Sequence, residues 1–169
     1  INFVGNADFT AQSNGEFNNS GTINVASGIF DAHTLDFRNN GGGKIQKADG
    51  QALDSLSVRV LRNNQGTINS DQIVVSGAFY NGEKGAATVT VGSLTAGSIL
   101  NYGQGTLTVN DTLTLNSLTN RGNATVKDLS LKQLVNEKDL TVNGTVSNLT
   151  SLSNSKNSTI NLGNSVIFD

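Results

Sequence analysis

The side chains with the clearest catalytic potential surround the single histidine, His33, which lies between Asp31 and Asp36. An imidazole beside a carboxylate can act as a general acid or base. In an extended chain, successive side chains point to opposite faces, so His33 shares a face with Asp31 but not with Asp36. No serine near them stands out as a nucleophile. We therefore interpret this segment as a solvated face of the protein and not as a catalytic site.

Three carboxylates, Asp31, Asp54 and Asp71, fall eight, nine and ten residues before three regularly spaced asparagines. If the repeats that contain them stack, these side chains could lie near one another on one face. Two carboxylates at a set separation can hydrolyse a glycosidic bond, and several oxygen ligands can hold calcium. The offset drifts by one residue from each repeat to the next, which favours ordinary exposed aspartates at turns. A carbohydrate-active site is the alternative.

The glycine clusters at residues 41–44 and 103–106 resemble phosphate-binding loops only superficially. Neither has the Walker A spacing, and neither opens a helix. The chain has no cysteine, which excludes disulfides, thiolate chemistry and cysteine-ligated zinc. The sequence therefore predicts turn glycines at these positions, and it predicts no enzyme, no catalytic residue, no cofactor and no metal site.

The elements that position these residues come from an internal repeat. Eight asparagines recur at intervals of 16 to 24 residues: Asn19, Asn39, Asn63, Asn81, Asn101, Asn120, Asn136 and Asn154. A large apolar residue lies two positions before each of them: Phe17, Phe37, Leu61, Phe79, Ile99, Leu118, Leu134 and Leu152. Only 36% of the chain is hydrophobic, so eight such residues in eight repeats are not expected by chance.

Positions after the asparagines follow the period less strictly. Six residues after them come Val25, Ile45, Asn69, Ala87, Leu107, Val126, Val142 and Ile160, and we expect such equivalent positions to stack. The third repeat fits better when its turn is shifted by one residue, to Asn64, Gly66 and Ile68. A one-residue bulge would produce that shift.

Each repeat has room for about three short alternating runs, which are too short for a helix of about 10–12 residues. It is also too short for a strand–helix–strand unit. The sequence predicts an all-β parallel β-helix of about eight coils of roughly 19 residues, with three short strands per coil joined by turns at Asn and Gly and stacked at about 4.8 Å. The apolar column would fill the interior, and the asparagines would form a hydrogen-bonded ladder at one corner. A leucine-rich repeat fits less well, because its helical backs need longer coils.

We expect residues 1–169 to form a single domain, with residues 1–16 as an irregular lead-in coil and residues 17–162 as the repeats. Phe3 and Phe9 would be the apolar points of the lead-in. A chain that begins at Ile1, without an initiator Met or a signal peptide, looks like a piece of a longer protein. The net charge of −2 and the pI of about 5.3 argue against a nucleic-acid surface. No apolar stretch approaches the roughly 18 residues of a membrane span.

Two segments break the repeat, and we predict that both are loops projecting from the rod: residues 41–51 and residues 80–85. Tyr80 and Tyr102 lie one residue before and one residue after their asparagines in adjacent coils, so they could be neighbours on the outer face. The predicted receptor contacts are Lys44, Lys47, Asp49, Tyr80, Glu83, Lys84 and Tyr102. The simpler interpretation is that the two tyrosines only cover a corner.

The repeat unit resembles a known pattern. Residues 17–25, 99–107 and 118–126 share the order seen in Leu118, Asn120, Gly122 and Val126, which is a large apolar residue, Asn, Gly and a second apolar residue. These units resemble the haemagglutinin repeats of filamentous-haemagglutinin-like exoproteins, which Gram-negative bacteria secrete by the two-partner route. That group includes filamentous adhesins and the stick proteins of contact-dependent growth inhibition systems.

The resemblance implies a right-handed parallel β-helix at the bacterial surface, exported through an outer-membrane transporter of the two-partner type. The secretion domain of the group carries Asn-Pro-Asn motifs, and this chain has no proline, so it would be a stretch of shaft or a receptor-binding segment. We expect a secreted, adhesive segment whose receptor is an outer-membrane protein, lipopolysaccharide or a host glycan. The alternatives are a polysaccharide lyase or hydrolase on the same fold and a passive shaft spacer of a contact-dependent inhibition toxin.

Overall fold

The structure, a computed structural model, describes residues 1–5, 7–8 and 15–169, and within them every helix or strand element is a β-strand. The strands are β1 (Asn2–Phe3), β2 (Ala7–Asp8), β3 (Glu16–Asn19), β4 (Thr22–Val25), β5 (Ile29–Asn39), β6 (Gly43–Lys47), β7 (Leu53–Asn63), β8 (Gly66–Asn81), β9 (Ala87–Asn101), β10 (Gly105–Asn120), β11 (Asn123–Asn136), β12 (Asp139–Val142), β13 (Val146–Leu149), β14 (Ser151–Asn154), β15 (Thr159–Leu162) and β16 (Val166–Phe168). In this described part no helix is long and apolar enough to cross a membrane.

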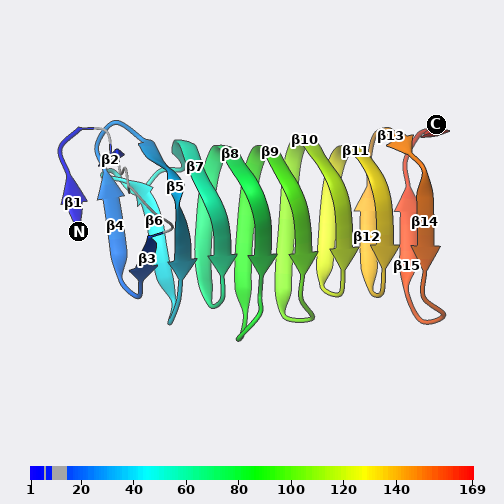
Figure 1. Cartoon of the computed structure of the whole chain (residues 1–169), viewed down its shortest axis with the longest axis horizontal. Helices are drawn as coiled ribbons and strands as arrows, with labels where there is room; N and C mark the ends of the chain where they lie inside the picture. Colours follow the sequence, from blue (N-terminus) through cyan, green and yellow to red (C-terminus); the bar gives the residue numbers. More distant parts are fainter. Residues whose placement is uncertain (6, 9–14) are drawn as a thin grey trace.

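The strands stack as successive coils of a parallel β-helix. One path of neighbouring strands runs β1-β4-β6-β8-β9-β10-β11-β12-β15, and its pairings are parallel. Figure 1 shows the coils side by side along the long axis, with the two ends of the chain at opposite ends of the rod. The prediction of an all-β solenoid of about eight coils is confirmed.

The three short strands predicted for each coil merge in the middle of the rod. β8, β9, β10 and β11 are 14 to 16 residues long, so each runs round a whole coil as one extended strand. Two corners of the coil are bends within the strand, and only the corner after the repeated asparagine is a true turn. A Cβ at Gly97, in one bend, would come within 2.8 Å of the Gly77 carbonyl oxygen, so this bend has room for glycine alone.

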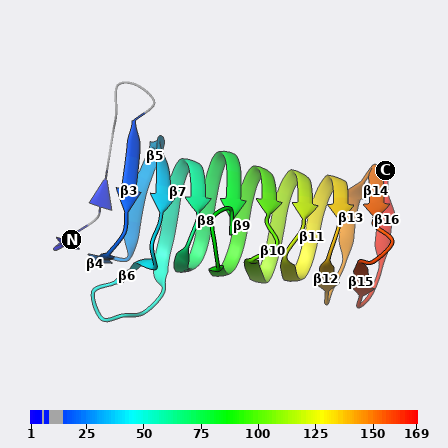
Figure 2. The same cartoon turned by 90° about the horizontal axis from the view of Figure 1, so that it is seen from below.

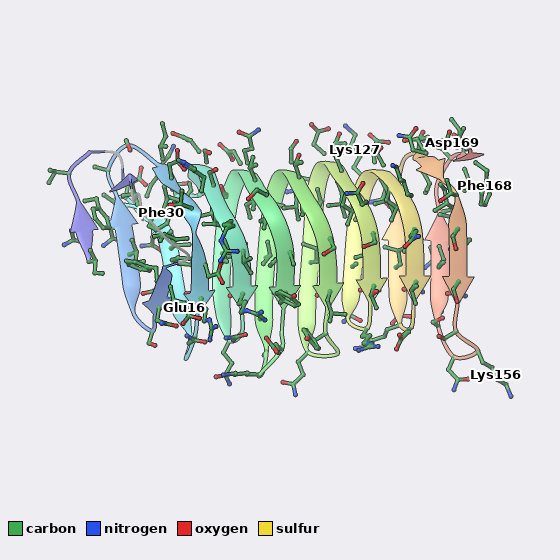
Figure 3. The ribbon with its side chains drawn as sticks, in the orientation of Figure 1. Glu16, Phe30, Lys127, Lys156, Phe168 and Asp169 are labelled. Atoms are coloured by element: carbon green, nitrogen blue, oxygen red, sulfur yellow. The ribbon has the colours of Figure 1, made fainter. Side chains whose placement is uncertain are left out.

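The predicted apolar column forms the core. Its members are paired in register from Phe17 through Phe37, Leu61, Phe79, Ile99, Leu118 and Leu134 to Leu152. Members in the middle of the rod are almost wholly buried, whereas Leu152 in the last coil is 43% exposed. Near the other end, the rings of Phe17 and Phe37 stack at 5.6 Å and Phe30 packs edge-on against both. Figure 3 shows Phe30 within the ribbon, while Lys127 and Lys156 project away from it.

The repeated asparagines form the predicted ladder. From Asn19 to Asn154, the side-chain Nδ2 of each one donates a hydrogen bond to the Oδ1 of the next, at 2.8 to 3.0 Å. The second proton of the amide goes to a backbone carbonyl, as from Asn81 to Thr106 and from Asn101 to Asn123. The amide protons of the ladder asparagines therefore have partners, as burial of polar groups requires. The neighbouring buried Asn64 is an exception at this corner, because its Oδ1 has no hydrogen-bond partner.

The expected column at a fixed six residues after the asparagine is wrong. The strand after the turn places Ile23, Ile45, Ile68, Val89, Leu107, Ala124, Leu140 and Ile160 in one column. The chain takes four residues from Asn19 to Ile23 but eight from Asn81 to Val89. The turn lies outside the stacked strands, so the stacking does not restrict its length. In the third repeat, Gly66 and Ile68 are in register with Gly43 and Ile45. Asn63, and not Asn64, stands in the ladder, so the predicted shift of the repeat to Asn64 is wrong.

The described parts of the lead-in pair with the coil that follows them. β1 pairs with β4 and places Phe3 beside Val25, and both β2 and β3 pair with β5. Phe3 packs partly buried against the core, as predicted. The other predicted apolar point, Phe9, lies outside the described residues.

Candidate contact surface

The predicted contact residues fall into two groups on different parts of the rod. Glu83, Lys84 and Tyr102 lie at the turns that follow Asn81 and Asn101, and Tyr80 lies in β8 directly before Asn81. Lys44, Lys47 and Asp49 lie on β6 and in the segment after it. The structure therefore brings together the first group and places the second elsewhere.

Residues 41–51 do not form one projecting loop, so that prediction is wrong. Gly43–Lys47 is strand β6, which stacks between β4 and β8, and the non-strand segment between β6 and β7 is residues 48–52. Figure 2 shows this segment extending away from the coils beside β6. Residues 80–85 are likewise only partly a loop, because Tyr80 and Asn81 end strand β8. In both places the strand continues further than the sequence indicates, because its partners on the neighbouring coils hold it.

Tyr80 points outward from β8 and is held by an arginine that the sequence analysis missed. The guanidinium of Arg62, its register partner in the preceding coil, lies 4.0 Å from the centroid of the Tyr80 ring. The same guanidinium is 3.1 Å from the Glu83 carboxylate. A cation over an aromatic ring is attracted by its negative face. The three side chains thus form one packed unit that spans two coils.

Tyr102 continues this surface into the next coil. Its backbone N–H donates to the Asn81 carbonyl oxygen at 2.8 Å, which fixes the start of the turn. Desolvation raises the pKa of the Tyr102 phenol, and the negative charge of Glu83 raises it further. Arg121 lies close enough to oppose that shift, and it pairs with Glu137 at 3.0 Å.

We call Arg62, Tyr80, Glu83, Tyr102 and Arg121 the tyrosine surface. The expectation that the tyrosines lie on one outer corner in adjacent coils agrees with the register. The missed arginines had a usable signal. Arg62 precedes its asparagine as Tyr80 does, and Arg121 follows its asparagine as Tyr102 does.

Lys47 and Asp49 belong to a charge cluster of their own. The Lys47 ammonium lies 2.5 Å from the Asp54 carboxylate. The hydrogen bond to Asp54 raises the pKa of Lys47, and the charges of Asp54, Asp49 and Asp71 add to this effect. The Lys47 charge is therefore already paired within the chain. Lys44 differs, because it is exposed on β6 and stands between Thr22 and Thr67 in the stack.

The carboxylates considered as a catalytic set are only partly aligned. Asp54 and Asp71 are at equivalent positions of neighbouring coils, since the residues on either side of them pair in register. Asp31 instead aligns with Ser57, which lies three residues after Asp54 in the next coil. In the part of the chain that the structure describes, no three acidic or histidine side chains are grouped so as to hold a metal ion.

His33 follows the alternation expected for an extended chain. Its Nδ1 lies 3.0 Å from Asp31 Oδ1, and both side chains are about half exposed. Asp36 is directed elsewhere and lies 2.5 Å from the Arg59 guanidinium. The histidine thus has one carboxylate partner, which is the one on its own face.

Comparison with known proteins adds no relative. No protein-family model matches the chain, and neither a curated protein nor a solved structure matches it. The β-solenoid is compatible with a β-helical repeat protein.

Proposed function

We propose that this chain is a β-helical segment of a large bacterial surface exoprotein of the haemagglutinin-repeat type and that it mediates adhesion to a target cell. The receptor would be an outer-membrane protein, lipopolysaccharide or a host glycan. Export would use an outer-membrane transporter of the two-partner type, and the segment would act at the bacterial surface.

The observation that carries the proposal is the tyrosine surface on an otherwise regular rod. Both tyrosines of the chain lie at one corner, and Tyr80 is ordered by the Arg62 guanidinium. Tyr and Arg dominate the binding energy of protein interfaces because they combine large contact area with hydrogen bonding. A rod that served only as a spacer would have no need of an ordered aromatic pair on its outer face.

Binding of the fluorescently labelled segment to whole bacterial and host cells tests the proposal. The variant Tyr80→Ala/Tyr102→Ala removes both rings, and Thr95→Ala/Thr114→Ala, at stacked outward positions on another face, is the matched control. We expect at least a tenfold loss of binding for the tyrosine variant and none for the control, since hot-spot side chains contribute about 2 kcal/mol or more.

Two results would count against this proposal. Equal binding by both variants would show that the tyrosine surface is not the contact. Absence of binding by the unsubstituted segment to every cell type would favour the passive shaft. Far-ultraviolet circular dichroism of each variant verifies that the β-helix is intact.

A further inference from the structure

A polar trench crosses the outer face of the rod at the start of β8. It consists of two hollows of about 550 and 230 Å³ that share Thr67 as a lining residue. The larger hollow opens between the turns at Gly42 and Ala86, and the smaller one is bounded by Gly50 and Gln51 of the segment after β6. Thr67 and Asn69 point outward between these boundaries and form the floor.

The trench results from unequal connections between the coils. The chain takes five residues from Asn63 to Ile68, against six from Asn39 to its stacked equivalent Ile45 and eight from Asn81 to Val89. The turn at Gln65 is therefore shorter than its neighbours on both sides. At the other end, residues 48–52 add a wall that the later coils lack (Figure 2).

The lining is uncharged and able to form hydrogen bonds, with one exception. Its side chains include the amides of Gln46, Gln65 and Asn69 and the hydroxyl of Thr67. The exception is the exposed Lys44, and no carboxylate lines either hollow. Within the residues that the structure describes, Lys44 has no acidic group within 4 Å, unlike Lys47, which is paired with Asp54.

A peptide strand cannot readily join this face. β8 is paired with β6 from Gly66 to Ile68 and with β9 along the whole stretch, so it offers no open edge. Recognition by strand addition requires an open sheet edge. The groups left to the trench are hydroxyls and amides, which both donate and accept hydrogen bonds, and one ammonium. Sugar hydroxyls can hydrogen-bond to the hydroxyls and amides, and an anionic substituent can pair with the ammonium.

We propose that this trench binds a short oligosaccharide that carries an acidic group. The Lys44 ammonium contacts the anion, and the Thr67 hydroxyl and the Asn69 amide bind the ring hydroxyls. This site has its own lining residues, and the turn of residues 82–86 separates it from the tyrosine surface. It specifies the kind of glycan named above, and to that extent it rests on the proposed function, but it would bind its saccharide whether or not the two tyrosines attach the segment to cells.

Isothermal titration of the full chain with sialyllactose, which has a single carboxylate, tests the site. Lactose is the neutral counterpart, and an acetylated peptide with one glutamate is the peptide counterpart. We expect saturable binding of sialyllactose, at least tenfold weaker binding of lactose and of the peptide, and a loss of affinity as salt screens the Lys44 charge. Lys44→Met should weaken the binding of sialyllactose at least tenfold. Lys132→Met, at an exposed lysine on another face, should leave it unchanged.

Asn69→Ala provides a second, charge-neutral variant, which should weaken the binding of both saccharides by the same factor. The proposal is overturned if sialyllactose does not bind, if lactose or the peptide binds as tightly, or if Lys44→Met and Lys132→Met have equal effects. Because these titrations involve no cells, their failure would leave the tyrosine-surface experiment unaffected, and the reverse also holds.

Discussion

Asn101, in the middle of the ladder, is the most direct place to measure how much the asparagines stabilise the rod. Its side chain is fully buried. It donates to Asn120 Oδ1 at 2.8 Å and to the Asn123 carbonyl oxygen at 3.1 Å, and it accepts from Asn81 Nδ2 at 2.9 Å. Replacement by alanine removes all three hydrogen bonds at a position that is shielded from solvent.

The expected cost follows from those three contacts. A hydrogen bond contributes about 0.5–1.5 kcal/mol net, and a buried group left without a partner costs about 1–3 kcal/mol. Asn81 Nδ2 retains its bond to the Thr106 carbonyl oxygen, so Asn120 Oδ1 is the group most clearly orphaned. We therefore expect Asn101→Ala to lower the free energy of unfolding by about 3–5 kcal/mol, a large part of the 5–15 kcal/mol typical of a domain.

Urea unfolding followed by circular dichroism measures this loss, with Asn110→Ala as the control. Asn110 is exposed in a bend of the next coil, so its replacement should change the stability by no more than about 0.5 kcal/mol. Since stacked repeats can open locally, hydrogen exchange should also rise first in β9, which ends at Asn101, and in the following strand β10. A cost for Asn101→Ala equal to that of the control would refute the view that the ladder stabilises the fold.

Three further results are expected. Gly105→Ala should lower the melting temperature because the new Cβ would collide with the ladder. A Cβ at Gly21 meets nothing within 4 Å, so Gly21→Ala should not lower it. Equal effects of the two substitutions would contradict this. Leu118→Ala should cost about 2–5 kcal/mol in urea unfolding, and Leu152→Ala, in the same column but 43% exposed, clearly less. Desolvation raises the pKa of Tyr102 in the folded protein. The neutral phenol should therefore stabilise the fold fully below about pH 10, and this stabilisation should be lost as the pH rises through the higher folded pKa. An ultraviolet titration that showed a normal or lowered phenol pKa would contradict this.

The ladder and the apolar column could be predicted from the sequence because both depend on positions that stack directly. A residue such as Asn120 meets its equivalents in the coils before and after it, so the same requirement recurs with every repeat. Positions after the turn could not be predicted by counting. Val126 lies six residues after its asparagine, but Ala124 is the residue in register with Leu107. The count fails because the turns, although they touch those of neighbouring coils, are not paired residue by residue as the strands are, so their lengths can differ.

The candidate sites were predicted less completely for a related reason. Tyr80 and Tyr102 were found through their offsets from the asparagines, and Arg62 could have been found in the same way. The partner of Lys47 could not, because Asp54 comes close only through the path of residues 48–52, which the repeat does not determine. Ion pairs on the outer face depend on local chain paths and rotamers, and periodicity carries no information about either.

Positions inside the coils and positions in the turns differ in how freely their residues can change. That difference indicates where function can arise on this rod. A change inside the coil must satisfy a neighbour on each side, as Gly105 must leave room for the amide of Asn101. A change in a turn meets solvent on one side, and connections of four to eight residues are all accommodated without a break in the ladder. The trench at Thr67 exists because three successive connections differ in length, and Glu83 and Tyr102 of the tyrosine surface lie on the longest of these turns and the one after it. Recognition by such a rod can therefore change through insertions at the asparagine corner while the core remains the same.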